Sequence, residues 1–233
     1  MESIDKINGT FGKRPTEIKS TVSSAVIRRL PRYHRCLGDL LREGKLRISS
    51  AELSRIMDVT ASQIRQDLNC FGGFGQQGYG YNIKFLYNKI SELLGVNEGY
   101  NAVIIGAGKL GRALAATHMF ERRGVNRIAM FDVDPTVIGT RIYDVPVYSV
   151  EELGDFCREN NIHIGVLTVP KEAALDVANT IVEAGVRGIW NFANMELRLD
   201  YPGVVVENIH LGDSLMALCY ELKTTIEKDE KND

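Results

Sequence analysis

Apolar residues recur at helical spacing in the first part of the chain. Between residues 22 and 41 they follow helical spacing, at Val22, Val26, Leu30, Tyr33, Leu37, Leu40 and Leu41. This spacing predicts an amphipathic helix, which Pro31 is expected to interrupt with a kink or a second helix start. Gly44 is its predicted end, and residues 1–20, which are mostly polar, are expected to form an N-terminal tail.

A second helical pattern follows at residues 47–68, RISSAELSRIMDVTASQIRQDL. Ser49 and Glu52 have the spacing of a capping box, and Thr60 with Gln63 repeats it, so two short helices joined by a tight turn are predicted. The positions expected to face inward are Leu53, Ile56 and Met57 on the first helix, and Ile64 and Leu68 on the second. Two helices joined in this way are typical of a helix-turn-helix.

The outward positions of the second helix carry side chains that can recognise DNA. They are Ser62, Gln63, Arg65 and Gln66. Arg binds guanine and Gln binds adenine through paired hydrogen bonds in the major groove, and Ser binds either base or phosphate. An ordinary solvated helix pair is the alternative interpretation. The next stretch, residues 71–81, interleaves glycine with aromatic residues around a Gln76-Gln77-Gly78 turn, which predicts a β-hairpin and hence a winged helix.

The pattern changes to alternating strands and helices after an amphipathic helix that begins near Ile83. Val103–Ile105 is predicted to be a buried strand, and the motif Gly106-x-Gly108-x-x-Gly111 then opens a helix carrying Leu114, Ala115 and Met119. A second strand ends at Asp132. This order is the dinucleotide-binding fingerprint, in which Asp132 accepts hydrogen bonds from a ribose diol and favours NAD(H) over NADP(H). The predicted cofactor-binding residues of the loop are Gly106, Ala107, Gly108, Lys109, Leu110 and Gly111.

Further strands are predicted at residues 145–148, 162–169, 186–193 and 204–208, with helices between them. Ser149 with Glu152 is expected to cap one helix, and Pro170 to begin another. Because the carboxyl ends of such strands line the cofactor crevice, the candidates to surround the nicotinamide are Thr168, Pro170, Asn191 and Phe192.

The last segment has one apolar helical stripe, formed by Leu211, Leu215, Leu218, Leu222 and Ile226. Such a stripe needs a partner. The helix either packs on its own sheet or packs on a second copy of the chain.

Composition divides the chain in two. Residues 1–90 hold 15 Lys and Arg against 8 Asp and Glu, whereas residues 91–233 hold 13 against 22. A basic N-terminal half suggests a polyanionic partner. No secretory signal or membrane-length apolar run is visible, so a cytoplasmic protein without a membrane partner is expected. The four cysteines are scattered, which predicts neither a zinc site nor a redox dithiol.

The dinucleotide fingerprint raises the possibility of an enzyme. The four histidines are His34, His118, His163 and His210, and neither His34 in the basic helix nor His163 in a predicted strand suggests catalysis. No large substrate domain follows the cofactor domain, so no catalytic residues are assigned and a signalling use of the cofactor is favoured. Two alternatives remain, an NAD-dependent oxidoreductase with an accessory DNA-binding module and a nucleotide-binding subunit without a DNA role.

Several segments together resemble the Rex family of redox-sensing transcriptional repressors. They are RRLPRYHRCL, residues 47–81, the GAGKLG motif, FDVDP, LTVPKEAA and WNFA. The resemblance implies an α/β protein with a polar tail (1–20), a winged helix-turn-helix domain (21–85), a Rossmann-like parallel-sheet domain binding NAD(H) (86–210) and a C-terminal helix (211–233) swapped between the subunits of a homodimer. It further implies that NAD⁺ or no ligand permits binding to palindromic operator DNA and that NADH causes release, regulating fermentative and respiratory genes.

The resemblance also implies roles for individual residues. Beside the groove-facing residues already named, the DNA-binding candidates are Arg35, Arg47, Ser49, Gln77 and Tyr79; the family links the arginine matched by Arg35 to the domain interface. Phe192 matches an aromatic residue that reaches toward the partner's nicotinamide pocket. Two positions depart from the family pattern, because Thr117 stands near a common tyrosine and Asn194 replaces a frequent proline.

Overall fold

The computed structural model describes residues 23–70, 75–76 and 80–230. The chain divides into two compact units between Gly95 and Val96. The predicted boundary after residue 85 is too early, because helix α4 (Ile83–Leu93) buries Ile83, Leu86 and Ile90 in the core of the first unit. The predicted tail, residues 1–20, lies outside the described residues.

The first unit has the winged-helix order of elements. These are α1 (Ser24–Arg42), β1 (Arg47–Ile48), α2 (Ser50–Met57), α3 (Ala61–Asn69), β2 (Gly75–Gln76), β3 (Gly80–Asn82) and α4. The three strands form an antiparallel sheet in the order β1-β3-β2, in which β2 and β3 are the strands of the predicted hairpin. Strand β1 was not predicted from the sequence.

Helix α1 is one continuous helix, with Pro31 inside it. The predicted second helix start is therefore wrong. Leu30 and Tyr33, on either side of Pro31, are both buried in the core of this unit, and this packing offsets the hydrogen bond that proline cannot donate. Gly44 has a φ of +76° directly after the helix, which confirms the predicted end.

The core of this unit follows the predicted pattern with one exception. Leu53, Met57, Ile64 and Leu68 are buried, but 52% of Ile56 is exposed. The short helix α2 buries one narrow stripe, formed by Leu53 and Met57, which are four positions apart. Ile56 is rotated by about 100° around the helix axis from Met57 and so lies beside this stripe. The predicted inward position of Ile56 is therefore wrong.

The second unit contains a seven-stranded sheet in the order β10-β9-β8-β4-β5-β7-β6. Its strands are β4 (Tyr100–Ile105), β5 (Val125–Asp132), β6 (Arg141–Ile142), β7 (Val145–Ser149), β8 (Ile164–Leu167), β9 (Gly188–Asn191) and β10 (Val205–Asn208). All neighbouring pairs are parallel except β6 with β7. The helical elements are α5 (Lys109–Ala115), η1 (Glu121–Arg123), η2 (Val150–Glu152), α6 (Leu153–Glu159) and α7 (Lys171–Glu183). Met119 lies beyond α5, which is shorter than predicted.

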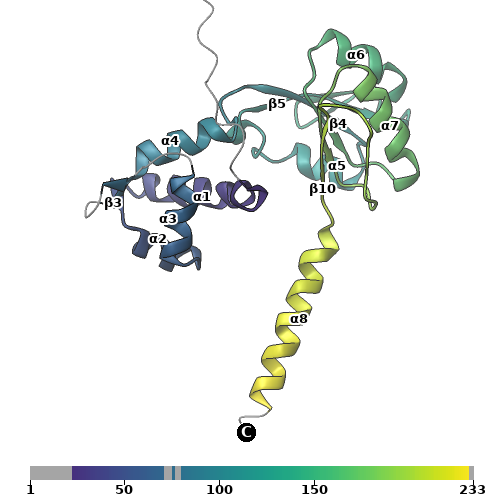
Figure 1. Cartoon of the computed structure of the whole chain (residues 1–233). Helices are drawn as coiled ribbons and strands as arrows, with labels where there is room; N and C mark the ends of the chain where they lie inside the picture. Colours follow the sequence, from purple (N-terminus) through teal and green to yellow (C-terminus); the bar gives the residue numbers. More distant parts are fainter. Residues whose placement is uncertain (1–22, 71–74, 77–79, 231–233) are drawn as a thin grey trace, which may run out of the picture. The chain divides into compact units, whose positions relative to one another are not determined.

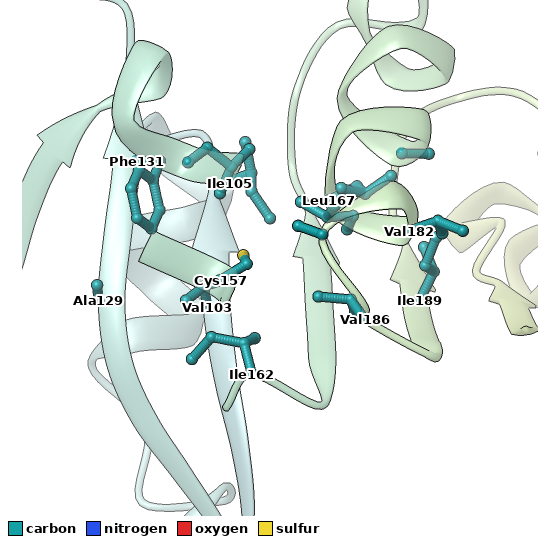
Figure 2. Close-up of a cluster of buried hydrophobic side chains, with 14 of the residues drawn as sticks. Val103, Ile105, Ala129, Phe131, Cys157, Ile162, Leu167, Val182, Val186 and Ile189 are labelled. Carbon is teal, nitrogen blue, oxygen red and sulfur yellow. The ribbon is translucent and has the colours of Figure 1, made fainter. Parts of the chain in front are cut away.

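Both faces of this sheet are covered, which explains the uninterrupted apolar run in β4. Val103 and Ile105 enter one core cluster with Phe131, whereas Ile104 enters another with Met130. Figure 2 shows the first cluster, in which side chains of the sheet meet those of α6 and α7. A central parallel strand with two buried faces needs apolar residues at every position.

Helix α8 (Leu211–Asp229) follows the last strand, β10 (Figure 1). None of its residues is buried, and Leu211, Leu215, Leu218, Leu222 and Ile226 are all exposed. The alternative that this helix packs on its own sheet is therefore wrong. No helix in the described part of the chain is long and apolar enough to cross a membrane.

Candidate nucleotide-binding and DNA-binding sites

The glycine loop after β4 combines two tightly packed glycines with an open one. Gly106 has a φ of +101°, and a Cβ atom there would lie 2.7 Å from the Thr168 carbonyl oxygen. A Cβ atom at Gly111 would overlap the Gly106 carbonyl oxygen, whereas one at Gly108 would meet no protein atom within 4 Å. Packing requires glycine at the first and third positions, and the second leaves the backbone open to a ligand.

Asp132 lies at the end of β5 and is bonded directly to this loop. Its Oδ2 accepts the Ala107 backbone N–H at 2.6 Å, and its Oδ1 accepts those of Val133 and Asp134 at 2.8 and 2.9 Å. Three fixed donors hold the carboxylate in one orientation beside the loop. This is the position from which an acidic residue accepts hydrogen bonds from a ribose diol.

Arg112, which the sequence analysis did not single out, supports the loop from α5. Its Nε donates to the Ala107 carbonyl oxygen at 2.7 Å. Ala107 is buried, Leu110 is half-buried, and Lys109 is exposed at the start of α5. Lys109 is therefore the loop side chain that is free of the core.

The carboxyl ends of β4, β8 and β9 bring the predicted crevice residues to one edge of the sheet. Thr168 follows β8, and its hydroxyl lies 3.0 and 2.8 Å from the Ile105 and Gly106 carbonyl oxygens. The Phe192 backbone N–H donates to the Leu167 carbonyl oxygen at 2.9 Å, and its ring lies 4.6 Å from the Trp190 ring. Pro170 is exposed. Thr168 and Phe192 thus follow neighbouring strands beside the glycine loop.

Asn191 has a different place from the other crevice candidates. It is completely buried. Its Nδ2 donates to the Met195 carbonyl oxygen at 3.0 Å and to Asn208 Oδ1 at 2.7 Å, and its Oδ1 accepts the Ala193 N–H at 3.0 Å. The side chain therefore holds the loop after β9, and a side-chain contact with a cofactor stays a prediction.

The exposed face of α3 carries Ser62, Arg65 and Gln66, while Gln63 is half-buried. Arg65 Nη1 donates to the Ser50 hydroxyl at 3.1 Å, which links the recognition helix candidate to α2. The Thr60 hydroxyl accepts the Gln63 N–H at 3.2 Å, so the predicted cap is present. A bond from the Thr60 backbone N–H to the Gln63 side chain, which would complete a capping box, is absent among the described contacts. The Gln63 amide donates to Asp67 instead.

Asp67 is a completely buried carboxylate on α3 that the sequence analysis missed. Arg29 donates to both of its oxygens at 2.7 Å, and the Tyr33 hydroxyl and Gln63 Nε2 donate at 2.9 and 2.8 Å. Burial alone would raise the pKa of Asp67, but the hydrogen bonds from Arg29, Gln63 and Tyr33 outweigh it and hold that pKa below its usual value. Burial, with the bond to Asp67, raises the pKa of the Tyr33 hydroxyl.

The remaining DNA-binding candidates lie outside α3. Arg35 is exposed on α1 and Arg47 is exposed on β1. The Ser49 hydroxyl accepts the Glu52 N–H at 3.1 Å and Glu52 Oε2 accepts the Ser49 backbone N–H at 2.9 Å, so the predicted capping box is confirmed. Gln77 and Tyr79 lie outside the described residues. Within the described ranges, no group of three or more His, Cys, Asp or Glu is placed to hold a metal ion.

Two family models match the chain, one to each unit. A model described as "Putative DNA-binding protein N-terminus" matches residues 21–69. A model described as "CoA binding domain" matches residues 97–195. The first match contains α1, α2 and α3, and the second contains the glycine loop and Asp132.

Curated relatives match over nearly the whole chain. A "Redox-sensing transcriptional repressor Rex" of Caldanaerobacter subterraneus subsp. tengcongensis is 52% identical over 204 residues, covering 88% of this chain and 91% of the relative. A protein of the same name from Clostridium perfringens is 52% identical over 206 residues, covering 88% and 97%.

Solved structures with both a similar sequence and a similar fold include RSP, described as a Rex-family repressor. RSP in complex with β-NAD⁺ and operator DNA has a TM-score of 0.83 and 50% identity, covering 92% of this chain and 99% of that one. RSP in complex with β-NADH has a TM-score of 0.83 and 48% identity, covering 92% and 100%.

Proposed function

Because this chain belongs to the Rex family of redox-sensing transcriptional repressors, we propose that its glycine loop binds NAD(H) and that α3 reads operator DNA. The protein is a redox-sensing repressor rather than an oxidoreductase, since its relatives at 52% identity are named repressors. The main support for assigning two different sites is that the glycine loop and helix α3 belong to different compact units. A nucleotide loop lies in one compact unit and an exposed recognition helix in the other.

The chemistry of the loop supports NAD(H) as the ligand. The open position at Gly108 leaves room for the pyrophosphate beside the backbone. Asp132 Oδ2, which accepts the Ala107 N–H alone among the described donors, retains acceptor capacity for a ribose hydroxyl, and the charge of the carboxylate would repel the 2′-phosphate of NADP(H). RSP, a solved relative, was obtained with both β-NAD⁺ and β-NADH. Thr168 and Phe192, at the ends of neighbouring strands, are the proposed neighbours of the nicotinamide.

Titration calorimetry with four nucleotides tests this site. NADH and NAD⁺ are expected to bind, and NADPH to bind at least about tenfold more weakly. Coenzyme A is the control suggested by the description of the second family model. Binding of coenzyme A in preference to NADH would contradict the proposed ligand.

The exposed side chains of α3 support a role in the major groove. Arg65 and Gln66 offer the donor and acceptor patterns that read guanine and adenine, and Ser62 suits a phosphate or a base. Arg47, Ser49, Gln77 and Tyr79 are proposed to contact the backbone or the minor groove. Arg35, on α1, is proposed to act at or near the domain interface.

Replacing Arg65 by Ala is expected to weaken operator binding by roughly 1–3 kcal/mol and to relax base preference at one position in each half-site. Ser50 loses its Arg65 partner in this variant, but both side chains lie at the surface. Fluorescence anisotropy with labelled duplexes measures the loss. An unchanged affinity would show that α3 does not read DNA.

The bare stripe on α8 supports a homodimer in which this helix packs on a second copy of the chain. No described part of its own chain covers the stripe. A symmetric dimer presents two recognition helices, which suits a palindromic operator with half-sites about one DNA turn apart.

The proposed switch selects between two dimer arrangements, one that binds DNA and one that does not. With NAD⁺ or no ligand the dimer adopts the first arrangement, and with NADH it adopts the second. A ligand that binds both arrangements equally shifts nothing, so NADH must prefer the arrangement that releases DNA. The regulated genes are proposed to be those of fermentation and respiration, and the site of action the cytoplasm.

One experiment tests the switch. Affinity for a palindromic duplex, selected by the protein from a random pool, is measured with NAD⁺, NADH and no nucleotide at one stated salt concentration. NADH is expected to lower the affinity, and NAD⁺ to maintain it. Equal affinity in all three conditions would contradict redox control.

A further inference from the structure

The half-buried Gln63 lies beside the exposed face of α3, and its amide is held by Asp67 one helical turn further on. Gln63 Nε2 donates to Asp67 Oδ1 at 2.8 Å. The same oxygen accepts Arg29 Nη2 at 2.7 Å, and Oδ2 accepts Arg29 Nε and the Tyr33 hydroxyl at 2.7 and 2.9 Å. A candidate DNA-reading side chain is thus joined to a buried ion pair.

An ionised carboxylate can accept hydrogen bonds but cannot donate one. Asp67 is completely buried and is paired through both oxygens with the Arg29 guanidinium, an arrangement that favours the charged form. The Gln63 amide must therefore turn its nitrogen toward Asp67. A reversed amide would place Oε1 against the carboxylate, an acceptor facing an acceptor.

We infer that Asp67 is a positioning residue for operator recognition, which sets the base preference of Gln63 by fixing the orientation of its amide. The bond to Asp67 uses one of the two Nε2 hydrogens, so Oε1 and the other hydrogen remain for a base. An acceptor beside a donor matches N6 and N7 of adenine. This inference rests on the proposed function of α3 in reading DNA.

Replacing Asp67 by Asn tests the inference, because an amide side chain offers Gln63 either a donor or an acceptor. Affinities are measured for the palindromic duplex that the wild-type protein selects from a random pool, and for duplexes substituted at one base pair per half-site. Asp67→Asn is expected to reduce the preference at a single base pair by roughly fivefold or more. Gln63→Ala should reduce the preference at that same base pair, and the double variant should show no further loss.

Tyr33→Phe is the matched control. It removes the hydrogen bond to Asp67 Oδ2, whereas the Gln63 amide donates to Asp67 Oδ1. It is expected to lower the midpoint of thermal unfolding while leaving base preference unchanged. Arg29→Lys is a milder second variant, in case Asp67→Asn fails to fold. It is expected to reduce the preference at the same base pair by a smaller factor, because the bidentate hydrogen bond to Asp67 is lost.

Two results would overturn the inference. One is a uniform loss of affinity for every duplex in Asp67→Asn, and the other is a relaxation of base preference by Tyr33→Phe as large as that by Asp67→Asn. Arg65→Ala separates this failure from failure of the proposed function. If Arg65→Ala weakens operator binding while Asp67→Asn leaves base preference intact, only the role of Asp67 is wrong.

Discussion

Gly108 and Gly111 share one loop, but different constraints require a glycine at each. Gly108 has a φ of −74°, which other residues adopt freely, and a Cβ atom there would touch no protein atom within 4 Å. A Cβ atom at Gly111 would overlap the Gly106 carbonyl oxygen. The first glycine therefore serves the ligand, and the second serves the fold.

Substitution by Ala should separate these two roles. Gly108→Ala is expected to keep a thermal unfolding midpoint near that of the wild type while losing at least about tenfold in NADH affinity, since the methyl group takes the space of the pyrophosphate. Gly111→Ala is expected to lower the midpoint itself. Differential scanning fluorimetry measures the unfolding midpoint, and calorimetric titration measures the NADH affinity. If Gly108→Ala bound NADH with the affinity of the wild type, the proposal that the pyrophosphate binds at this loop would be wrong.

Asp67 gives the first unit a sensitivity to acid. Its pKa is lower in the folded chain than the usual value, because the hydrogen bonds from its partners outweigh the effect of burial. A lowered pKa contributes stability that is complete above the unfolded value of about 3.9 and is lost as pH falls through the folded value. The first unit should therefore lose stability below about pH 4, where the unfolded chain takes up protons first.

Denaturant unfolding across acidic pH measures this contribution. Asp67→Asn should flatten the dependence of the unfolding free energy on pH, at a lower overall stability. Asp39→Asn is the control, because Asp39 forms an exposed ion pair with Arg42, and such pairs contribute little. A slope unchanged by Asp67→Asn would assign the acid sensitivity to other groups.

Helix α8 exposes a whole stripe of apolar side chains to solvent. Leu218→Asp places a charge in the middle of its apolar stripe and should raise the dimer dissociation constant at least about 100-fold, because an unpaired charge buried at an interface costs roughly 3 kcal/mol or more. Thr224→Asp introduces the same residue on the opposite side of the helix and should leave the dimer intact. Light scattering over a dilution series distinguishes the two, and an intact dimer in Leu218→Asp would contradict the proposed role of α8.

The sequence predicted those elements whose signals are local. The Ser49–Glu52 capping box and the order of strand, glycine loop, helix and Asp132 lie within short stretches, and the structure contains each of them. Strand β1 has only two residues and depends on pairing with β3, where Ile48 meets Tyr81. No local pattern marks such a strand, so it could not be predicted.

Long-range contacts explain the other differences. Asp67 lies among polar residues of α3 and reads as exposed in the sequence, but its partner Arg29 comes from α1. Pro31 indicates a helix break locally, whereas the packing of Leu30 and Tyr33 keeps α1 continuous. The geometry of the glycine loop was predictable from its spacing, whereas the hydrogen bond of Gln63 to the buried Asp67 was not.

At the scale of the whole molecule, the chain contains two compact units, and we expect them to unfold separately. The proposed nucleotide site lies in Val96–Asp233, and the proposed recognition helix α3 lies in the first unit. A ligand stabilises only the unit whose folded form binds it. NADH at about 100 times its dissociation constant should stabilise the second unit by roughly 2.7 kcal/mol.

Calorimetric scans with and without NADH test this expectation. Two transitions are expected, of which NADH raises one, while Asp67→Asn lowers the other. A single transition that responds to both changes would mean that the two units unfold as one cooperative body in the dimer.

The exposed stripe of α8 leads us to expect that degradation of this protein depends on its own concentration. A chain without a partner presents Leu215, Leu218 and Leu222 to any protease or chaperone that recognises exposed apolar segments, and mass action sets how long it remains in that state. At low protein concentration a larger fraction of the chains would be monomers that proteases can degrade. The cell would therefore hold few inactive monomers. Limited proteolysis at a fixed enzyme ratio should cut the C-terminal helix faster as the protein is diluted.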